Sequence, residues 1–250
     1  KLVCKDYETM LKVIKKDTYE DLSMAAFEVL KAVITANPHA ILGLATGDSP
    51  LGLYKEMIRD FRDNGTSFKD ICSFNLDEYV GLEKDHPASY WTFMHKNLFK
   101  YIDISSKNVH IPSGLGDVEE NCRVYEAALK KNIIDLQVLG IGSDGHIGFN
   151  EPGGSFDSET HITKLLEQTR KDNARFFDGD ITRVPTHAIT MGIASIMRTK
   201  KILLLATGKN KADAVYGMLK GEKTTSCPAS ILRDHPNVIV SLDKEASTRI

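Results

Sequence analysis

Asp144, His146 and Glu151 are the side chains of this sequence that are best suited to chemistry. They lie close together in the segment Leu139–Pro152, directly after an apolar stretch, and the segment also contains four glycines. Glycine lets the backbone turn sharply and approach a ligand closely, because no Cβ stands in the way. A glycine-rich loop with three ionisable groups is more typical of a site than of a spacer, so we predict a site here.

A pair of adjacent carboxylates, Asp77 and Glu78, follows a second apolar run, Ile71–Leu76. Two carboxylates directly after a predicted strand are unusual, and they mark a second candidate site. The alternative interpretation is structural: one carboxylate caps a turn and the other is solvated. The local sequence leaves both interpretations open.

An anion site is predicted at the turn formed by Gly47, Asp48 and Ser49, between an apolar stretch and an amphipathic segment. Pro50 suits the first position of a helix, and the free N–H groups at such a helix start favour an anion. A capped turn without a ligand is the alternative. The Asp48 carboxylate would repel a phosphate unless its side chain points away.

Two cations could complete such an anion site. Arg175 lies beside two aromatic rings, where it acts either as an anion clamp or as a surface side chain whose stem covers apolar neighbours. Lys211 lies at a predicted helix start. A cation there opposes the helix dipole by ~0.3–1 kcal/mol unless an anion is near.

The elements that must position these residues alternate along the chain. Apolar runs predict strands, listed here in order: Lys1–Tyr7, Ala40–Leu44, Ile71–Leu76, Val109–Ile111, Ile133–Ile141, Thr186–Met191, Ile202–Ala206 and Val238–Leu242. Amphipathic segments between them predict helices, and Thr18 with Asp21 predicts a capping box at the first. The alternation predicts an α/β fold with a doubly wound, mostly parallel sheet and helices on both faces. The carboxyl ends of such strands share one edge, so the candidate residues should meet in one cleft.

The length and composition favour one domain over residues 1–250, with a mobile lid predicted in the polar segment 153–180. A net charge of -2 gives no general attraction to nucleic acid, and no apolar run approaches the ~20 residues that span a membrane. We therefore expect a cytoplasmic protein. The four cysteines lie far apart and the eight histidines lack metal-ligand spacing, so we expect reduced thiols and no metal.

Several words of this sequence occur in the same order in a known family. They are Gly43–Gly47 followed by Ser49–Pro50, Phe74–Tyr79, Gly140–Pro152, Arg175–Phe177 and Thr190–Ile193. With these words, which extend over nearly the whole chain, the sequence resembles the glucosamine-6-phosphate deaminase family, also called the glucosamine/galactosamine-6-phosphate isomerase family. The resemblance implies a Rossmann-like enzyme of amino-sugar catabolism that converts glucosamine 6-phosphate and water to fructose 6-phosphate and ammonia. It implies aldose–ketose isomerisation coupled to deamination, without a metal or organic cofactor.

The resemblance also implies a role for each candidate residue. Asp77 would accept the C2 proton of the opened sugar, and His146 would be the ring-opening base. Asp144 would orient the imidazole, and Glu151 would be a further ring-opening residue. The 6-phosphate would be held by the turn and the two cations: Gly47, Asp48, Ser49, Arg175 and Lys211.

The sequence departs from the family pattern at two places. Many members have Gly or Ser where this chain has Asp48. The allosteric, hexameric members carry an Arg-x-Lys pair where this chain has residues 161–163, and a longer C-terminus, so we expect no activation by N-acetylglucosamine 6-phosphate. We expect a sugar phosphate as the partner, no nucleic acid or membrane, and a monomer or small homo-oligomer.

Two alternative functions are weighed against the deaminase. A 6-phosphogluconolactonase shares the Gly-x-Asp-Gly-His word, but Asn150–Pro152 and Asp77–Tyr79 favour the deaminase. A non-catalytic sugar-phosphate-sensing domain would keep the phosphate loops and would need no base. The retained acidic residues and His146 disfavour it.

Overall fold

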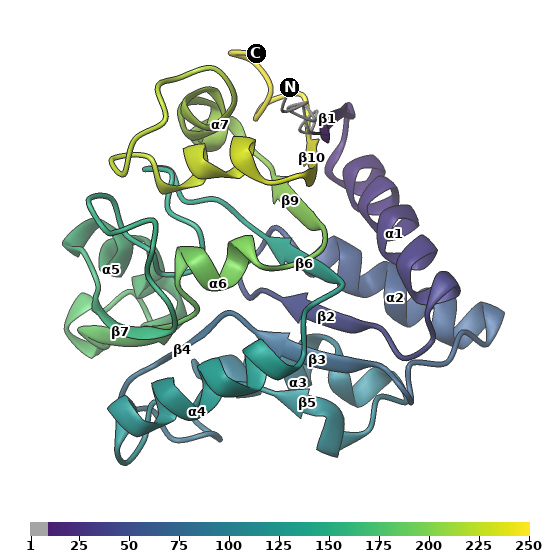
Figure 1. The fold of residues 1–250 in the computed structure, drawn as a ribbon, viewed down its shortest axis with the longest axis horizontal. Coiled ribbons are helices and arrows are strands. Elements are labelled where there is room, and N and C mark those ends of the chain that lie inside the picture. Colours follow the sequence, from purple (N-terminus) through teal and green to yellow (C-terminus); the bar gives the residue numbers. More distant parts are fainter. Residues whose placement is uncertain (1–9) are drawn as a thin grey trace, which may run out of the picture.

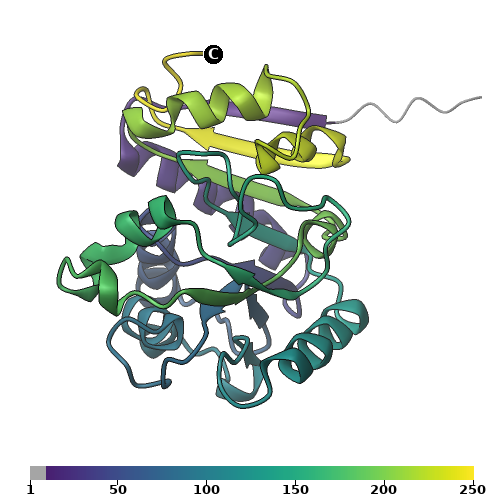
Figure 2. The same ribbon diagram turned by 90° about the vertical axis from the view of Figure 1, so that its left-hand side faces the viewer.

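A seven-stranded parallel sheet forms the centre of the molecule, which the computed structural model describes over residues 10–250 (Figure 1). Its strand order is β1-β10-β9-β6-β2-β3-β5, and all its pairings are parallel. Figure 2 shows this order, from β1 and β10 at the top towards β3 lower down. Its strands are β1 (Met10–Lys15), β2 (Ile41–Leu44), β3 (Cys72–Asn75), β5 (Val109–His110), β6 (Leu136–Leu139), β9 (Ile202–Ala206) and β10 (Asn237–Leu242).

Helices cover both faces of this sheet, as the alternation predicts. One apolar core lies under α1, α2 and α3, and a second lies under α4, α6 and α7 on the opposite face. Strands β6 and β9 are buried along their whole length, because both of their faces are covered. The helices are α1 (Tyr19–Ala36), α2 (Leu51–Asn64), α3 (Tyr90–Asn97), α4 (Val118–Lys131), α5 (Glu167–Asn173), α6 (Ile193–Met197) and α7 (Ala212–Leu219).

Local sequence signals set most of these boundaries. The Thr18 hydroxyl accepts a hydrogen bond from the Asp21 backbone N–H at 3.1 Å, which confirms the predicted cap at the start of α1. The helix ends at Ala36, and its C-cap Asn37 directly precedes a proline. The strand predicted at Lys1–Tyr7 lies outside the described residues. Among residues 10–250 the first strand is β1, which was not predicted from the sequence.

A second, antiparallel sheet departs from the sequence-based expectation. It contains β4 (Asp77–Tyr79), β8 (His187–Thr190) and β7 (His161–Lys164), in the order β4-β8-β7. The prediction that Thr186–Met191 joins the parallel sheet is therefore wrong, because this segment pairs antiparallel with β4 and β7. The strand predicted at Ile71–Leu76 ends at Asn75, and Asp77, which was expected directly after it, begins the separate strand β4.

The polar segment 153–180 contains regular structure that its composition concealed. It includes β7, α5 and a 3-10 helix, η3 (Ala174–Phe177). The buried Glu126 carboxylate holds the residue directly before β7, since it accepts hydrogen bonds from the backbone and side chain of Thr160 and pairs with Arg198. Strand β7 is only partly buried and α5 is short, so neither leaves a clear periodic pattern. The mobile lid remains a prediction.

Two further expectations concern the chain as a whole. Over residues 10–250, no helix combines the length and the apolar character needed to cross a membrane. Cys72, Cys122 and Cys227 are free thiols, in line with the expected reduced cysteines.

The contribution of the Thr18 N-cap to the stability of the protein can be tested by mutation. We expect Thr18→Ala to lower the free energy of unfolding by ~1 kcal/mol, because the first turn loses an acceptor for its free N–H groups. Urea unfolding measures this change. Thr18→Ser keeps the hydroxyl and should stay near the parent value, so an equal loss in both variants would contradict the assignment.

Candidate active site

A cavity of about 890 Å³ opens where β2, β6 and β9 end. Residues Thr46, Gly140 and Thr207, each close behind one of these strands, line it. The predicted site residues that also line it are Gly47, Asp48, Ser49, Asp77, His146, Arg175 and Lys211. The expectation that the candidate residues meet in one cleft at the carboxyl edge of the sheet is confirmed for Gly47, Asp48, Ser49, His146 and Lys211, whereas Asp77 and Arg175 reach the cleft from β4 and η3.

Asp77 reaches this cavity from the second sheet, where it pairs with Thr190 of β8. Its side chain is only 7% exposed. The glycine-rich loop passes directly over it at Gly148, which has φ +57°. A Cβ at Gly148 would lie 3.0 Å from Thr190 Oγ1 and 3.7 Å from Asp77 Oδ2, so a larger residue would disturb this contact.

Burial controls the protonation of Asp77. It raises the pKa of the carboxyl from 3.8 to about 8, and the adjacent Glu78 charge adds to the effect. In the ligand-free site the carboxyl is therefore mostly neutral at pH 7, and a nearby cation would favour its ionised form.

Glu78 has a structural role beside Asp77. Its carboxylate accepts hydrogen bonds from the backbone N–H groups of Tyr79, Tyr90 and Trp91 at 2.9–3.1 Å. Two of these groups belong to the first turn of α3, so Glu78 caps that helix. The structural alternative for the acidic pair thus holds for Glu78, whereas Asp77 faces the cavity.

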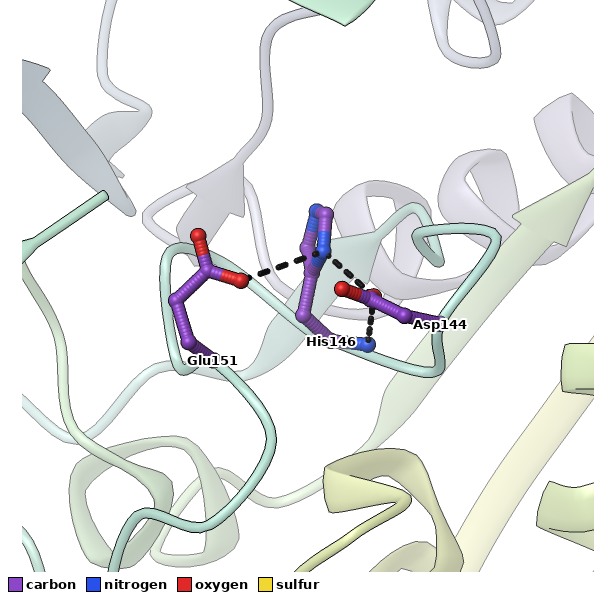
Figure 3. Close-up of side chains that lie close together, drawn as sticks. All are labelled: Asp144, His146 and Glu151. Atoms are coloured by element: carbon purple, nitrogen blue, oxygen red, sulfur yellow. Dashed lines mark hydrogen bonds and ion pairs between the residues drawn. The ribbon is translucent and has the colours of Figure 1, made fainter. Parts of the chain in front are cut away.

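His146 lies between Asp144 and Glu151 in the loop after β6 (Figure 3). Its Nδ1 atom is 2.7 Å from Asp144 Oδ1, and its backbone N–H donates to the same oxygen at 3.1 Å. Burial alone would raise the pKa of Asp144, but the hydrogen bonds and charge of His146 outweigh it and hold that pKa below its usual value. An ionised Asp144 keeps the proton on Nδ1, which leaves Nε2 of a neutral ring as an acceptor.

Glu151 approaches the same imidazole from the other side. Its Oε2 atom is 3.9 Å from His146 Nδ1 and has no hydrogen-bond partner among the described residues. Its Oε1 atom accepts a hydrogen bond from the Leu166 backbone N–H at 3.3 Å. Neither Glu151 nor Asp144 is among the residues that line the cavity, whereas His146 is.

The predicted anion turn is held in place by Tyr19. Its hydroxyl lies within 3.0 Å of the carbonyl oxygens of Asp48 and Ser49 and accepts a hydrogen bond from the Gly52 backbone N–H at 2.7 Å. Gly47 has φ +92°, a conformation that favours glycine. Helix α2 follows at Leu51, so Pro50 is its N-cap and not its first residue as predicted.

Both predicted cations line the same cavity as this turn. Arg175 Nη1 lies 2.6 Å from Asp48 Oδ2, and the guanidinium stacks on the Phe176 ring at 4.6 Å. Lys211 directly precedes α7. Burial lowers the pKa of Lys211, and the charge of Asp172 opposes that effect. Two cations and two carboxylates, Asp48 and Asp172, thus line the same cavity as the turn before α2.

Some residues of the cavity were not predicted from the sequence. Tyr90, Thr169, Asp172, Asn173 and Asn210 also line it. The Asn173 amide donates to the Tyr79 hydroxyl at 2.9 Å, which ties α5 to β4. Asp172 and Asn173 are close in sequence to Arg175, and Asn210 is next to Lys211. This closeness is the only signal that could have indicated these three residues.

A metal ion was not expected from the sequence. Among residues 10–250, the side chains that could hold one are Asp144, His146 and Glu151, whose ligand atoms lie within 4.8 Å of one another. An ion on Nδ1 would replace the hydrogen bond between His146 and Asp144. The absence of a metal remains a prediction.

The fold of this chain also occurs in solved structures of low sequence identity. A solved 6-phosphogluconolactonase from Trypanosoma brucei matches with a TM-score of 0.79, covering 97% of this chain and 99% of its own, at 19% identity. Such identity shows a shared fold alone. The family model described as glucosamine-6-phosphate isomerases/6-phosphogluconolactonase matches residues 15–240, and the chain belongs to this family.

Relatives with higher sequence identity are named for one of the two activities in this family, the deaminase. A glucosamine-6-phosphate deaminase from Thermoanaerobacter pseudethanolicus is 50% identical over 242 residues, which are 96% of this chain and 95% of the relative. A solved structure described as a monomeric glucosamine-6-phosphate deaminase is 46% identical, with a TM-score of 0.93. It covers 96% of this chain and is itself fully covered.

The raised pKa of Asp77 predicts a pH-dependent stability. Between the unfolded pKa of about 3.9 and the folded value of about 8, the folded state binds a proton that the unfolded state has released. The contribution of Asp77 to stability therefore falls as the pH rises through this window. We expect Asp77→Asn to be increasingly more stable than the parent from pH 5 to pH 9, by an order of a few kcal/mol at most.

Urea unfolding of the ligand-free parent and variant at pH 5, 7 and 9 measures this difference. A difference that stays constant across the three values would contradict a buried, mostly neutral Asp77.

Proposed function

We propose that this protein is a glucosamine-6-phosphate deaminase, which converts glucosamine 6-phosphate and water to fructose 6-phosphate and ammonia. The observation that carries the proposal is one cavity with a buried carboxyl, Asp77, an Asp-oriented imidazole, His146, and a cationic end at Arg175 and Lys211. The deaminase relatives, at 46–50% identity over nearly the whole chain, support it. We further propose that it acts in the cytoplasm as a monomer or small homo-oligomer.

Ring opening is the first step and belongs to His146. Opening a cyclic hemiacetal requires loss of the proton from the C1 hydroxyl and delivery of a proton to the ring oxygen. Because Nδ1 is held by Asp144, the Nε2 atom of His146 would take the first proton and return it to the ring oxygen. Glu151 lies within 3.9 Å of Nδ1 and would stabilise the transient imidazolium.

Asp77 would then carry out the carbon-acid step. The carboxylate removes the C2 proton of the open-chain sugar while the C2 ammonium passes a proton to the C1 oxygen, which gives an enolamine. The Asp77 carboxyl then returns its proton to C1, which leaves a protonated imine at C2. Water adds to this imine and ammonia leaves, so fructose 6-phosphate remains. A base must be ionised, and the ammonium on C2 of the arriving substrate would favour ionisation of the otherwise neutral Asp77.

The phosphate would bind at the opposite end of the cavity. The turn at Gly47 and Ser49 precedes α2, and such helix starts favour anions. Arg175 and Lys211 add two positive charges there. Binding at this end would place C1 and C2 towards His146 and Asp77, since both line the same cavity.

The carbon-acid role of Asp77 leads to a direct test. The parent should release ammonia from glucosamine 6-phosphate, and Asp77→Asn should lower kcat by ~10²–10⁴-fold, because the base is lost. A coupled ammonia assay measures turnover, and phosphate binding by the variant shows that its site is intact. Full turnover in the variant would contradict the role.

The other functions give different results in the same assay. Hydrolysis of 6-phosphogluconolactone without ammonia release would show a lactonase instead. Binding of the sugar phosphate with neither product would show a sensing domain.

The ring-opening role of His146 has a separate test. We expect His146→Gln to lower kcat on glucosamine 6-phosphate by ~10²-fold or more, because the cyclic sugar is no longer opened by the imidazole. The variant should bind 2-amino-2-deoxyglucitol 6-phosphate, an open-chain analogue, as tightly as the parent does. Calorimetry measures this affinity, and a parallel loss of analogue binding would assign His146 to binding and not to ring opening.

A further inference from the structure

The ion pair between Asp48 and Arg175 joins two segments that line the cavity. Asp48 belongs to the turn before α2, and Arg175 belongs to η3 in the segment 153–180. Their side chains meet at 2.6 Å, and both residues line the cavity. The carboxylate therefore lies on the guanidinium that the proposed function assigns to the substrate phosphate.

A guanidinium binds a carboxylate and a phosphate in the same way, through its planar set of N–H donors. The nitrogen that contacts Asp48 is thus not free for a phosphate oxygen until the pair opens. The backbone of Asp48 is fixed by Tyr19, so its carboxylate remains near the turn when a ligand arrives. We propose that Asp48 is an internal competitor of phosphate for Arg175, and that it sets the affinity of this end of the cavity.

The inference rests on the proposed function, because it takes this end of the cavity as the phosphate site. In this inference the Asp48 side chain weakens phosphate binding, whereas the backbone of the same turn still contributes to it. Lys211 is subject to similar negative charge, since Asp172, Asp144 and Asp48 all act on it electrostatically. Acidic groups therefore reduce the pull of both cations on a free anion.

Asp48 lowers the affinity for every phosphate ligand, so the contacts that a ligand makes elsewhere in the cavity decide how tightly it binds. Any phosphate ligand must displace Asp48, but a sugar phosphate also contacts the rest of the cavity and reaches Asp77 and His146. Inorganic phosphate lacks these contacts, so it should bind more weakly than the sugar phosphate.

The expected change in phosphate affinity follows from the solvent exposure of the two paired side chains. The side chains of Asp48 and Arg175 are 54% and 58% exposed, so their pairing is weak, as for other surface ion pairs. Its loss should tighten phosphate binding by about two- to fivefold.

The experiment compares Asp48→Asn and Asp48→Ser with a matched control, Asp63→Asn. Asp63 also pairs with an arginine, Arg62, at 2.7 Å, and its side chain is 49% exposed. It lies near the end of α2, whereas Asp48 lies before the start, so the same charge is removed outside the cavity. Isothermal titration calorimetry with inorganic phosphate gives Kd, and initial rates with glucosamine 6-phosphate give KM and kcat.

We expect both Asp48 variants to lower Kd for phosphate about two- to fivefold, and KM to fall with it while kcat/KM rises. Asp63→Asn should leave Kd at the parent value. An unchanged or raised Kd in the Asp48 variants, or an equal change in Asp63→Asn, would overturn the inference. So would a parent that does not bind phosphate at all.

The calorimetric arm does not depend on turnover. Phosphate binding that tightens in a protein without deaminase activity would support the role of Asp48 and contradict the proposed function alone. Deaminase activity with unaltered phosphate binding in the variants would contradict only the role of Asp48.

Discussion

The site depends on the close approach of the glycine-rich loop to strand β4. At Gly148 the loop lies so near Thr190 that a Cβ would crowd the threonine hydroxyl, and Asp77 lies within van der Waals contact of the same point. This approach brings His146, which follows a strand of the parallel sheet, to the same cavity as Asp77, which belongs to the antiparallel sheet. Without it, the groups proposed for ring opening and for the carbon-acid step would belong to separate parts of the molecule.

The same arrangement separates the acidities of two carboxyls in one site. Burial without a hydrogen-bonding cation raises the pKa of Asp77 to about 8. Asp144 is also partly buried, but the bonds from His146 hold its pKa below the usual value. Such separation allows one group to exchange a proton during the reaction while the other stays charged and orients a base. The two carboxyls thus differ through their surroundings and not through their residue type.

Much of the fold could be predicted from short-range patterns. Ile202–Ala206 forms the predicted strand with the same bounds, and the capping box at Thr18 starts α1 as expected. These signals depend on neighbours within a few residues. Strand β4 has three polar or aromatic residues, Asp77–Tyr79, and no period that could distinguish it from a loop. It becomes a strand only because β8, more than a hundred residues later, pairs with it.

The sequence by itself determined which residues are candidates for chemistry, since their types and their places after apolar runs are local properties. Only the tertiary structure decided what each does: Glu78 caps α3 while Asp77 faces the cavity, and Asp48 pairs with Arg175. It also placed Asp144 and Glu151 around His146 rather than in the cavity wall. Direction, burial and partner arise from contacts between segments far apart in the chain, and no local pattern encodes them.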